Sequence, residues 1–201
     1  MKNPIYNLIN QLDSSQIDQS RKNLLEPIRS YLFQKIKQNS KINLNFICTH
    51  NSRRSQFCQI WAKVIADFYG LKINSFSGGI EITACNKRTI TSLKRMNFKV
   101  KHSFGENPQY QLNYDDNKTP ALLFSKIYDD APNPKSHFAA ILTCSHADKN
   151  CPIIQGAEKR FYLPYEDPKV FDDTIDEAKV YDDCSIQIAK ELKFLFSELL
   201  I

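Results

Sequence analysis

The sequence has 201 residues, of which 42% are hydrophobic and 24% are charged, and its formal net charge is +5. These proportions are ordinary for a soluble protein with one full core, and the length exceeds a typical domain of about 150 residues. No run of about 18 apolar residues is present, and the first residues lack the apolar core of a signal peptide. We therefore expect no membrane partner and a cytoplasmic location, where disulfides are usually transient and catalytic. The six cysteines are candidates for chemistry.

The charges argue against a nucleic-acid partner. Basic residues are scattered, and no basic run exceeds two residues, as at Arg53-Arg54, whereas binding along a phosphate backbone needs a clustered stripe of Lys and Arg. Acidic residues do cluster between Glu166 and Asp183. We interpret that cluster as a solvated helix face together with its N-terminal turn.

Residues 1–40 are predicted to form a helical extension. Apolar side chains recur there at intervals of three and four and make one helix face: Leu24, Leu25, Ile28, Tyr31, Leu32 and Ile36. Pro27 interrupts this pattern, so we expect a helix to restart there with Pro27 in its first turn. Residues 42–48 then alternate apolar and polar before becoming wholly apolar, which predicts a strand that enters a buried sheet.

Helices and strands alternate in the next part of the chain. A helix is predicted over about 54–69, because apolar side chains recur on one face and Gly70 is well placed to end it. A short strand over 71–76, a helix over 84–96 and an extended piece beginning at Phe98 follow. This order of elements is typical of a parallel α/β sheet.

The pattern changes between about 103 and 135. Residues 109–114 and 121–128 have the composition of two strands around a polar turn, so we predict an inserted hairpin. A buried strand over 138–143 and a long terminal helix over 171–200 complete the predicted elements.

The segment Cys48-Thr49-His50-Asn51-Ser52-Arg53-Arg54-Ser55 joins the first strand to the next helix. Backbone N–H groups converge in such a loop and the helix dipole adds positive potential, so the loop is a candidate site for a tetrahedral oxyanion. The guanidinium of Arg54 can close over the anion, and the same field favours the thiolate of Cys48 as a nucleophile that Ser55 can hydrogen-bond. The alternative is a structural buried cysteine. The candidate oxyanion-binding residues are Thr49, His50, Asn51, Ser52, Arg53, Arg54 and Ser55.

A nucleophile that attacks phosphorus or arsenic needs an acid to protonate the leaving oxygen. The best candidate is Asp167, because the rigid Pro168 that follows it would fix a loop carrying its carboxyl group. The alternative is a surface turn, since Asp-Pro is a common turn opening.

Cys144 and Cys151 lie seven residues apart after a buried strand, with a polar segment between them that we expect to be mobile. Disulfide exchange needs an accessible thiolate and a movable partner, so the pair is a candidate redox relay. Two unreactive thiols are one alternative. Zinc held by Cys144, His146 and Cys151 is another, but a fourth ligand of suitable spacing is missing, and we expect no metal site.

Several segments resemble those of a known group of enzymes. Cys48-x5-Arg54-Ser55 and Asp167-Pro168 are similar to motifs of the low-molecular-weight tyrosine phosphatase superfamily. Within it, the thioredoxin-coupled arsenate reductases are resembled by three longer segments: 48–56, Phe76-Ser77-Gly78-Gly79-Ile80-Glu81 and Thr143-Cys144-Ser145-His146-Ala147-Asp148-Lys149-Asn150-Cys151-Pro152. The resemblance covers about 42–197 and leaves out the N-terminal extension and the hairpin.

The resemblance implies an α/β fold with a four-stranded parallel sheet flanked by helices. We expect a helical N-terminal extension over 1–40 and a phosphatase-like domain over 41–201, with the insertion at about 103–135 and no cofactor. Asn51 is implied to hold the loop in its binding conformation. His50 stands where the loop of that group usually has Gly, and its Cβ would be strained at positive φ.

The resemblance also implies roles for individual residues. Cys48 would attack arsenate held by Arg54 and the loop amides, with Asp167 as general acid. Cys144 would then attack Cys48 and release arsenite. Cys151 would attack Cys144 and leave a disulfide for thioredoxin, the implied reductant, to reduce.

Three functions therefore compete. The first is arsenate reduction through the three cysteines. The second is hydrolysis of phosphotyrosine or a small phosphomonoester through a phosphoenzyme on Cys48, which needs neither Cys144 nor Cys151. The third is a non-catalytic module that binds an oxyanion or a partner. We favour the reductase, because the cysteine pair has no role in the phosphatase.

Overall fold

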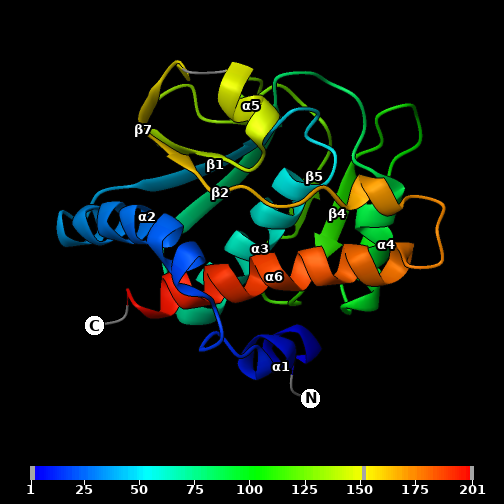
Figure 1. Ribbon diagram of the computed structural model, residues 1–201, viewed down its shortest axis with the longest axis horizontal. Helices are drawn as coiled ribbons and strands as arrows, with labels where there is room; N and C mark the ends of the chain where they lie inside the picture. The colour runs from blue at the N-terminus through cyan, green and yellow to red at the C-terminus, as the bar shows by residue number, and fades with distance from the viewer. Residues whose placement is uncertain (1–2, 151–152, 200–201) are drawn as a thin grey trace.

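The computed structural model describes residues 3–150 and 153–199. Four parallel strands form its central sheet in the order β2-β1-β6-β7 (Figure 1). Helices flank this sheet, so the predicted four-stranded parallel α/β fold is confirmed. The strands are β1 (Ile42–Cys48), β2 (Ile73–Gly79), β6 (Phe138–Leu142) and β7 (Ala157–Tyr162).

The central strand β1 is buried along its whole length. Its side chains alternate between two cores, with Phe46 in the larger one and Ile47 in a smaller one on the other face of the sheet. Asn45 is fully buried, and its amide donates to the backbone carbonyl of Tyr128 at 2.8 Å. A polar side chain is tolerated in this strand because that hydrogen bond replaces its contact with water.

Helices cover both faces of the sheet. On one face, α3 (Arg54–Tyr69) packs against β1 and β2, and α6 (Glu177–Ser197) packs against α3. The indole of the buried Trp61 donates to the hydroxyl of Ser185 at 2.8 Å and ties these two helices together. On the other face, α5 (Ser145–Asn150) contacts β1 and β6.

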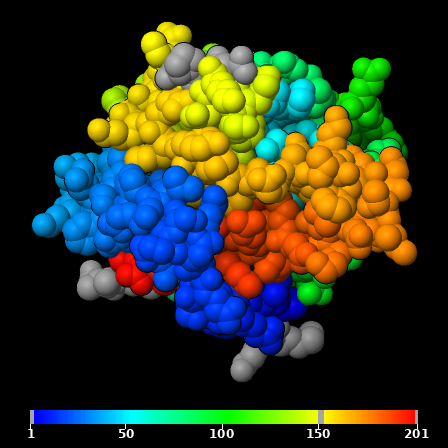
Figure 2. All heavy atoms as spheres, in the orientation of Figure 1, coloured from blue at the N-terminus to red at the C-terminus, as the bar shows by residue number. Residues whose placement is uncertain are grey.

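Two helices precede the sheet, α1 (Pro4–Gln11) and α2 (Gln19–Lys37). Helix α2 contacts β1, β7 and α6, and lies beside α6 in Figures 1 and 2. The predicted restart at Pro27 is wrong, because α2 begins after the capping residue Asp18 and continues through the proline. Buried side chains on both sides of Pro27 fix the helix against the core: Leu25, Ile28 and Leu32. Within 3–150 and 153–199, no helix is both long and apolar enough to cross a membrane.

A second, antiparallel sheet contains the predicted hairpin and one further strand, in the order β3-β4-β5. The piece beginning at Phe98 belongs to this sheet rather than to the parallel one, because its charged, mostly exposed side chains do not suit a sheet covered on both faces. The second hairpin strand ends at Leu123, not at Tyr128, since residues 124–128 turn toward the β1–α3 loop. The three strands are β3 (Lys99–His102), β4 (Tyr110–Asn113) and β5 (Ala121–Leu123).

Some other predicted boundaries differ from the structure. Helix α4 (Lys87–Arg95) begins only after Asn86, whose side chain caps it. The long terminal helix begins at Glu177, because a short 3₁₀ helix over Pro168–Phe171 comes before it. Strand β7 was not predicted, since its partly exposed side chains show no apolar alternation.

The acidic cluster near the C-terminus is not simply a solvated face. Its carboxylates form ion pairs with arginines of the β1–α3 loop and of α4, because the folded chain brings these segments together. The cluster therefore links α6 and the loop before it to α4 and to the β1–α3 loop. The pairs are Arg53–Asp172 (3.0 Å), Arg88–Glu177 (2.6 Å) and Arg95–Asp182 (2.7 Å).

Candidate active site

Cys48 is the last residue of β1, and its side chain is buried beneath the loop that leads to α3. The hydroxyl of Ser55 lies 3.1 Å from its Sγ. The amide of Asn51 donates to the same hydroxyl oxygen at 2.8 Å. Because that oxygen already accepts a hydrogen bond, the Ser55 proton is free to be donated to the sulfur.

Asn51 gives the loop its shape. Its φ of 47° lies in the left-handed region, which Asn tolerates better than most residues, whereas His50 does not adopt a positive φ. The side-chain oxygen of Asn51 accepts from the backbone N–H of Lys126 at 3.1 Å, and its carbonyl accepts from Gln56 at 2.7 Å. Sequence reasoning placed Gln56 in the segment that resembles the reductase loop but gave it no role, and it did not single out Lys126.

The two glycines at the end of β2 allow the loop to pack against that strand. A Cβ on Gly79 would lie 2.8 Å from the carbonyl oxygen of Thr49 and 2.9 Å from the backbone nitrogen of Asn51. A Cβ on Gly78 would collide with the backbone of Tyr128. Both positions therefore require glycine, which gives a physical reason for the Ser77-Gly78-Gly79 segment.

Several hydrogen-bond donors near the start of α3 have no acceptor among the described residues. No side chain caps this helix, and in the described part of the chain the backbone N–H groups of residues 49–53 have no protein acceptor. The Nε of Arg54 is buried, also without an acceptor among the described residues. Uncapped N–H groups at a helix start and a free guanidinium N–H are the donors that an oxyanion requires.

The remaining nitrogens of Arg54 bind the segment that carries Asp167. Nη2 lies 2.6 Å from Oδ2 of Asp167, and Nη1 donates to the carbonyl of Tyr165 at 3.1 Å. Asp167 is partly exposed and also begins the short 3₁₀ helix. The structure therefore brings the candidate acid to the candidate anion-binding arginine.

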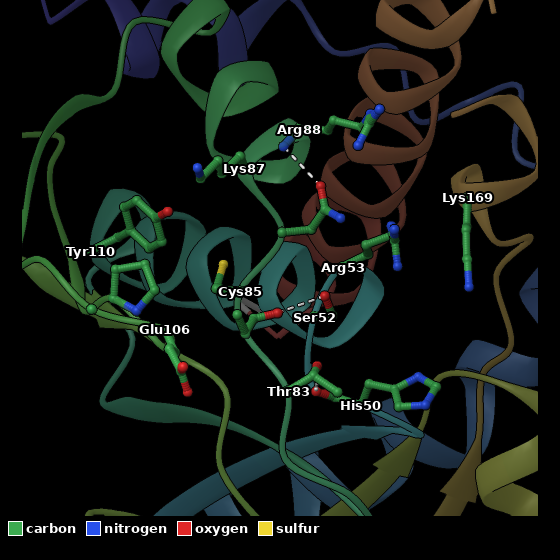
Figure 3. Close-up of a pocket in the computed structure, with 14 residues that line it drawn as sticks. His50, Ser52, Arg53, Thr83, Cys85, Lys87, Arg88, Glu106, Tyr110 and Lys169 are labelled. Carbon is green, nitrogen blue, oxygen red and sulfur yellow. Dashed lines mark hydrogen bonds between the residues drawn. The ribbon is translucent and has the colours of Figure 1, made fainter. Parts of the chain in front are cut away.

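Three other loop side chains have partners in the protein. The Nε2 of His50 lies 3.2 Å from Glu81, and the hydroxyl of Ser52 donates to the carbonyl of Ala84 at 2.7 Å (Figure 3). The guanidinium of Arg53 binds Tyr181 at 2.6 Å and Asp172 at 3.0 Å. Thus Asp172 and Tyr181 hold the charge of Arg53 beside the loop.

Cys144 lies next to the loop. Its buried Sγ is 3.5 Å from the hydroxyl of Thr49, which is also 3.2 Å from Nδ1 of His146. Cys48 and Cys144 belong to the same small core. The segment after Cys144 forms the short helix α5, and Cys151 lies outside the described residues.

Comparison with known proteins connects this geometry to a family. No protein-family model matches the sequence. The chain is 30% identical over 128 residues to arsenate reductase 2 of Staphylococcus epidermidis. The matched region covers 64% of this chain and 79% of that protein. The chain belongs to the arsenate reductase family. It is also 31% identical over 128 residues to arsenate reductase 1 of Staphylococcus saprophyticus, with the same two coverages.

Solved structures support the fold of this reductase family member. A low-molecular-weight protein tyrosine phosphatase from T. tengcongensis matches 78% of this chain and 99% of its own, with a TM-score of 0.53 and 14% identity. An arsenate reductase from Archaeoglobus fulgidus matches 77% of this chain and 98% of its own, with a TM-score of 0.51 and 14% identity. The predicted low-molecular-weight phosphatase-like fold is therefore confirmed.

Three further cysteines of this chain, Cys58, Cys85 and Cys184, are poor nucleophiles. Burial raises the pKa of the Cys58 thiol well above its ordinary value, and that of Cys85 and Cys184 to about 12. Near neutral pH these side chains are thiols, which suits residues that pack in the core. In residues 3–150 and 153–199, no three His, Cys, Asp or Glu side chains are grouped to hold a metal ion.

A cavity of about 640 Å³ lies beside the anion-binding loop (Figure 3). His50, Ser52 and Arg53 line it on the side of the loop, and Glu106 and Tyr110 line it from the antiparallel sheet and its connection. Those two residues lie in the insertion, outside the part of the sequence that resembles the reductases. In this family member the insertion therefore reaches the candidate site.

Proposed function

We propose that the protein is a thioredoxin-dependent arsenate reductase. The observation that carries the proposal is the contact between Cys144 and Thr49, because it brings a second thiol to the residue that follows the nucleophile. A phosphatase has no use for that thiol. Cys48 and Cys144 belong to the same small core, which supports disulfide exchange between them.

The first step uses the anion-binding loop. Arsenate binds to the free N–H groups of the loop and to Arg54, displacing the carboxylate of Asp167 from the guanidinium. The thiolate of Cys48 attacks arsenic, and one oxygen leaves as water with a proton from Asp167. The Ser55 hydroxyl supports the thiolate before attack.

The second half of the reaction transfers two electrons from the cysteine thiols to arsenic. The thiolate of Cys144 attacks the sulfur of Cys48, so that an S–S bond forms and the S–As bond breaks. Arsenic keeps the electron pair and leaves as arsenite. Cys151 then attacks Cys144 and releases the Cys48 thiolate, and the dithiol of thioredoxin reduces the Cys144–Cys151 disulfide.

A second candidate is a phosphomonoesterase that uses only the first half of this chemistry. The cavity beside the loop favours it, because a free oxyanion as small as arsenate does not need about 640 Å³ of lined space. In that case Cys48 forms a phosphoenzyme that water hydrolyses, and Asp167 protonates the leaving alcohol.

The experiment that separates the two is turnover of arsenate with thioredoxin, thioredoxin reductase and NADPH, run beside hydrolysis of p-nitrophenyl phosphate. We expect NADPH oxidation that depends on arsenate and is lost in Cys48→Ser. Cys184→Ser is the control, since this thiol lies outside the relay. Hydrolysis of the ester without NADPH oxidation would reject the reductase in favour of the phosphatase.

A further inference from the structure

Arg21, in the first turn of α2, reaches from the N-terminal extension to the segment that precedes Asp167. Its Nη1 donates to the carbonyl of Pro164 at 2.7 Å. Its guanidinium carbon lies 4.9 Å from the centre of the Tyr165 ring. The extension, which the family resemblance leaves out, thus contacts the chain within a few residues of the candidate acid.

A buried carboxylate orients this arginine. The Nε and Nη2 of Arg21 bind the two oxygens of Glu191 on α6 at 2.9 and 2.7 Å, and Glu191 is only 2% exposed. Two parallel hydrogen bonds fix the plane of a guanidinium, so the remaining nitrogen is held toward Pro164. A lysine cannot make all three bonds in this geometry.

Arg54 holds the next carbonyl of the same segment. It donates to Tyr165 at 3.1 Å, so Arg21 and Arg54 bind the carbonyls of two consecutive residues. The segment 163–167 has no regular secondary structure. The Tyr165 N–H donates to Thr143 at 3.1 Å, which links the segment to the end of β6. The Leu163 N–H also donates to Leu142 at 2.9 Å, and the side chains of Leu163 and Tyr165 are buried, so the two arginines act together with these contacts.

We propose that Arg21 is a positioning residue for Asp167, and that α2 therefore belongs to the catalytic machinery. Arg21 holds the carbonyl of Pro164, which fixes Tyr165 and the chain up to Asp167 relative to Arg54. Figure 1 shows α2 lying alongside α6, from which Glu191 completes the arrangement. The inference rests on the proposed role of Asp167 as general acid.

The test compares esters that differ in how much they need an acid. Phenyl phosphate has a more basic leaving oxygen than p-nitrophenyl phosphate, so misplacing the acid slows its hydrolysis more. We expect Arg21→Gln to reduce kcat/KM for phenyl phosphate about tenfold more than for p-nitrophenyl phosphate, in the same direction as Asp167→Asn. Arg21→Lys should fall between wild type and Arg21→Gln.

Controls separate positioning from loss of folding. Arg29→Gln removes an arginine from the same helix that pairs with Glu26 at 2.6 Å, and it should leave the ratio unchanged. The double variant Arg21→Gln, Glu191→Gln avoids an unpaired buried carboxylate and should keep the altered ratio. Amide exchange of residues 165–167 should rise in Arg21→Gln and not in Arg29→Gln.

The outcomes are distinguishable. Suppose that the Arg21 variants slow both esters equally, while Asp167→Asn slows phenyl phosphate more than p-nitrophenyl phosphate. That result would overturn the inference about Arg21 and leave Asp167 as the acid. Unchanged amide exchange at 165–167 would overturn it as well, with or without measurable hydrolysis. If Asp167→Asn slows both esters equally, Asp167 is not the acid of the proposed mechanism, and Arg21 has no acid to position.

Discussion

Arg54 and Asp167 form an ion pair with 2.6 Å between Nη2 and Oδ2. The arginine that we assign to anion binding is therefore occupied by the carboxylate that we assign to acid catalysis. An incoming oxyanion has to take the place of that carboxylate. The side chain of Asp167 is 33% exposed, so its carboxylate can move into water when the anion binds. The pair keeps the carboxyl group of Asp167 beside Arg54 until the anion binds.

Asp167→Asn should separate binding from catalysis. Removing the competing carboxylate leaves Arg54 free, so inorganic phosphate should inhibit the variant more strongly than the wild type. Loss of the acid should slow hydrolysis of p-nitrophenyl phosphate about 10²–10⁴-fold. Steady-state kinetics with phosphate as inhibitor measures both effects. An unchanged rate would exclude Asp167 as the acid. Asp183→Asn, at an exposed pair with Lys179, is the control.

Cys144→Ser should separate the two candidate activities, arsenate reduction and phosphomonoester hydrolysis. The first step needs only the loop and Asp167, so hydrolysis of p-nitrophenyl phosphate should remain close to that of the wild type. Arsenate reduction coupled to thioredoxin should be lost, because no thiol is left to attack Cys48. Both rates are measured on one preparation. Equal loss of both activities would mean that Cys144 supports the structure of the loop rather than the relay.

Local sequence determines the centre of the candidate site. Helix α3 begins and ends where predicted, at Arg54 and Tyr69, because a buried strand precedes it and Gly70 follows in the left-handed conformation. Cys48, Ser55 and the glycines of β2 are all close in sequence to a strand end. Their positions depend on local geometry, and sequence patterns describe that well.

Contacts between distant residues were not predictable in this way. The bond from Arg21 to Pro164 spans 143 residues, and the one from Lys126 to Asn51 spans 75. Nothing in the sequence near Arg21 distinguishes it from a solvated helix residue. Only the packing of α2 against α6 turns its side chain toward Glu191, so the role of the N-terminal extension could be recognised only from the fold.

Ser55→Ala should weaken both the loop and the nucleophile. The variant removes a donor from Cys48 and leaves the amide of the buried Asn51 without its acceptor. We expect a loss of about 1–3 kcal/mol in the free energy of unfolding, as for a buried donor left unsatisfied. Turnover of p-nitrophenyl phosphate should fall by at least about tenfold. Urea denaturation and kinetics measure the two effects. Ser30→Ala, on the exposed side of α2, should change neither.

Lys126 should make stability depend on pH. Its side chain is 3% exposed, with the ammonium 3.5 Å from the carbonyl of Phe124, and burial lowers its pKa from 10.5 to about 8. Between these two values the unfolded chain holds the proton and the folded chain does not. Unfolding then takes up a proton, so this residue's contribution to stability rises with pH across the window and is constant below it.

The comparison with Lys126→Met isolates that contribution, because the other groups that titrate in this range are present in both proteins. The free energy of unfolding of the wild type, minus that of the variant, should rise by on the order of 3 kcal/mol from about pH 8 to about pH 10.5. Urea denaturation with a reductant present measures it. Parallel pH profiles would mean that Lys126 stays protonated in the folded state, with its ammonium charge held behind the anion-binding loop throughout.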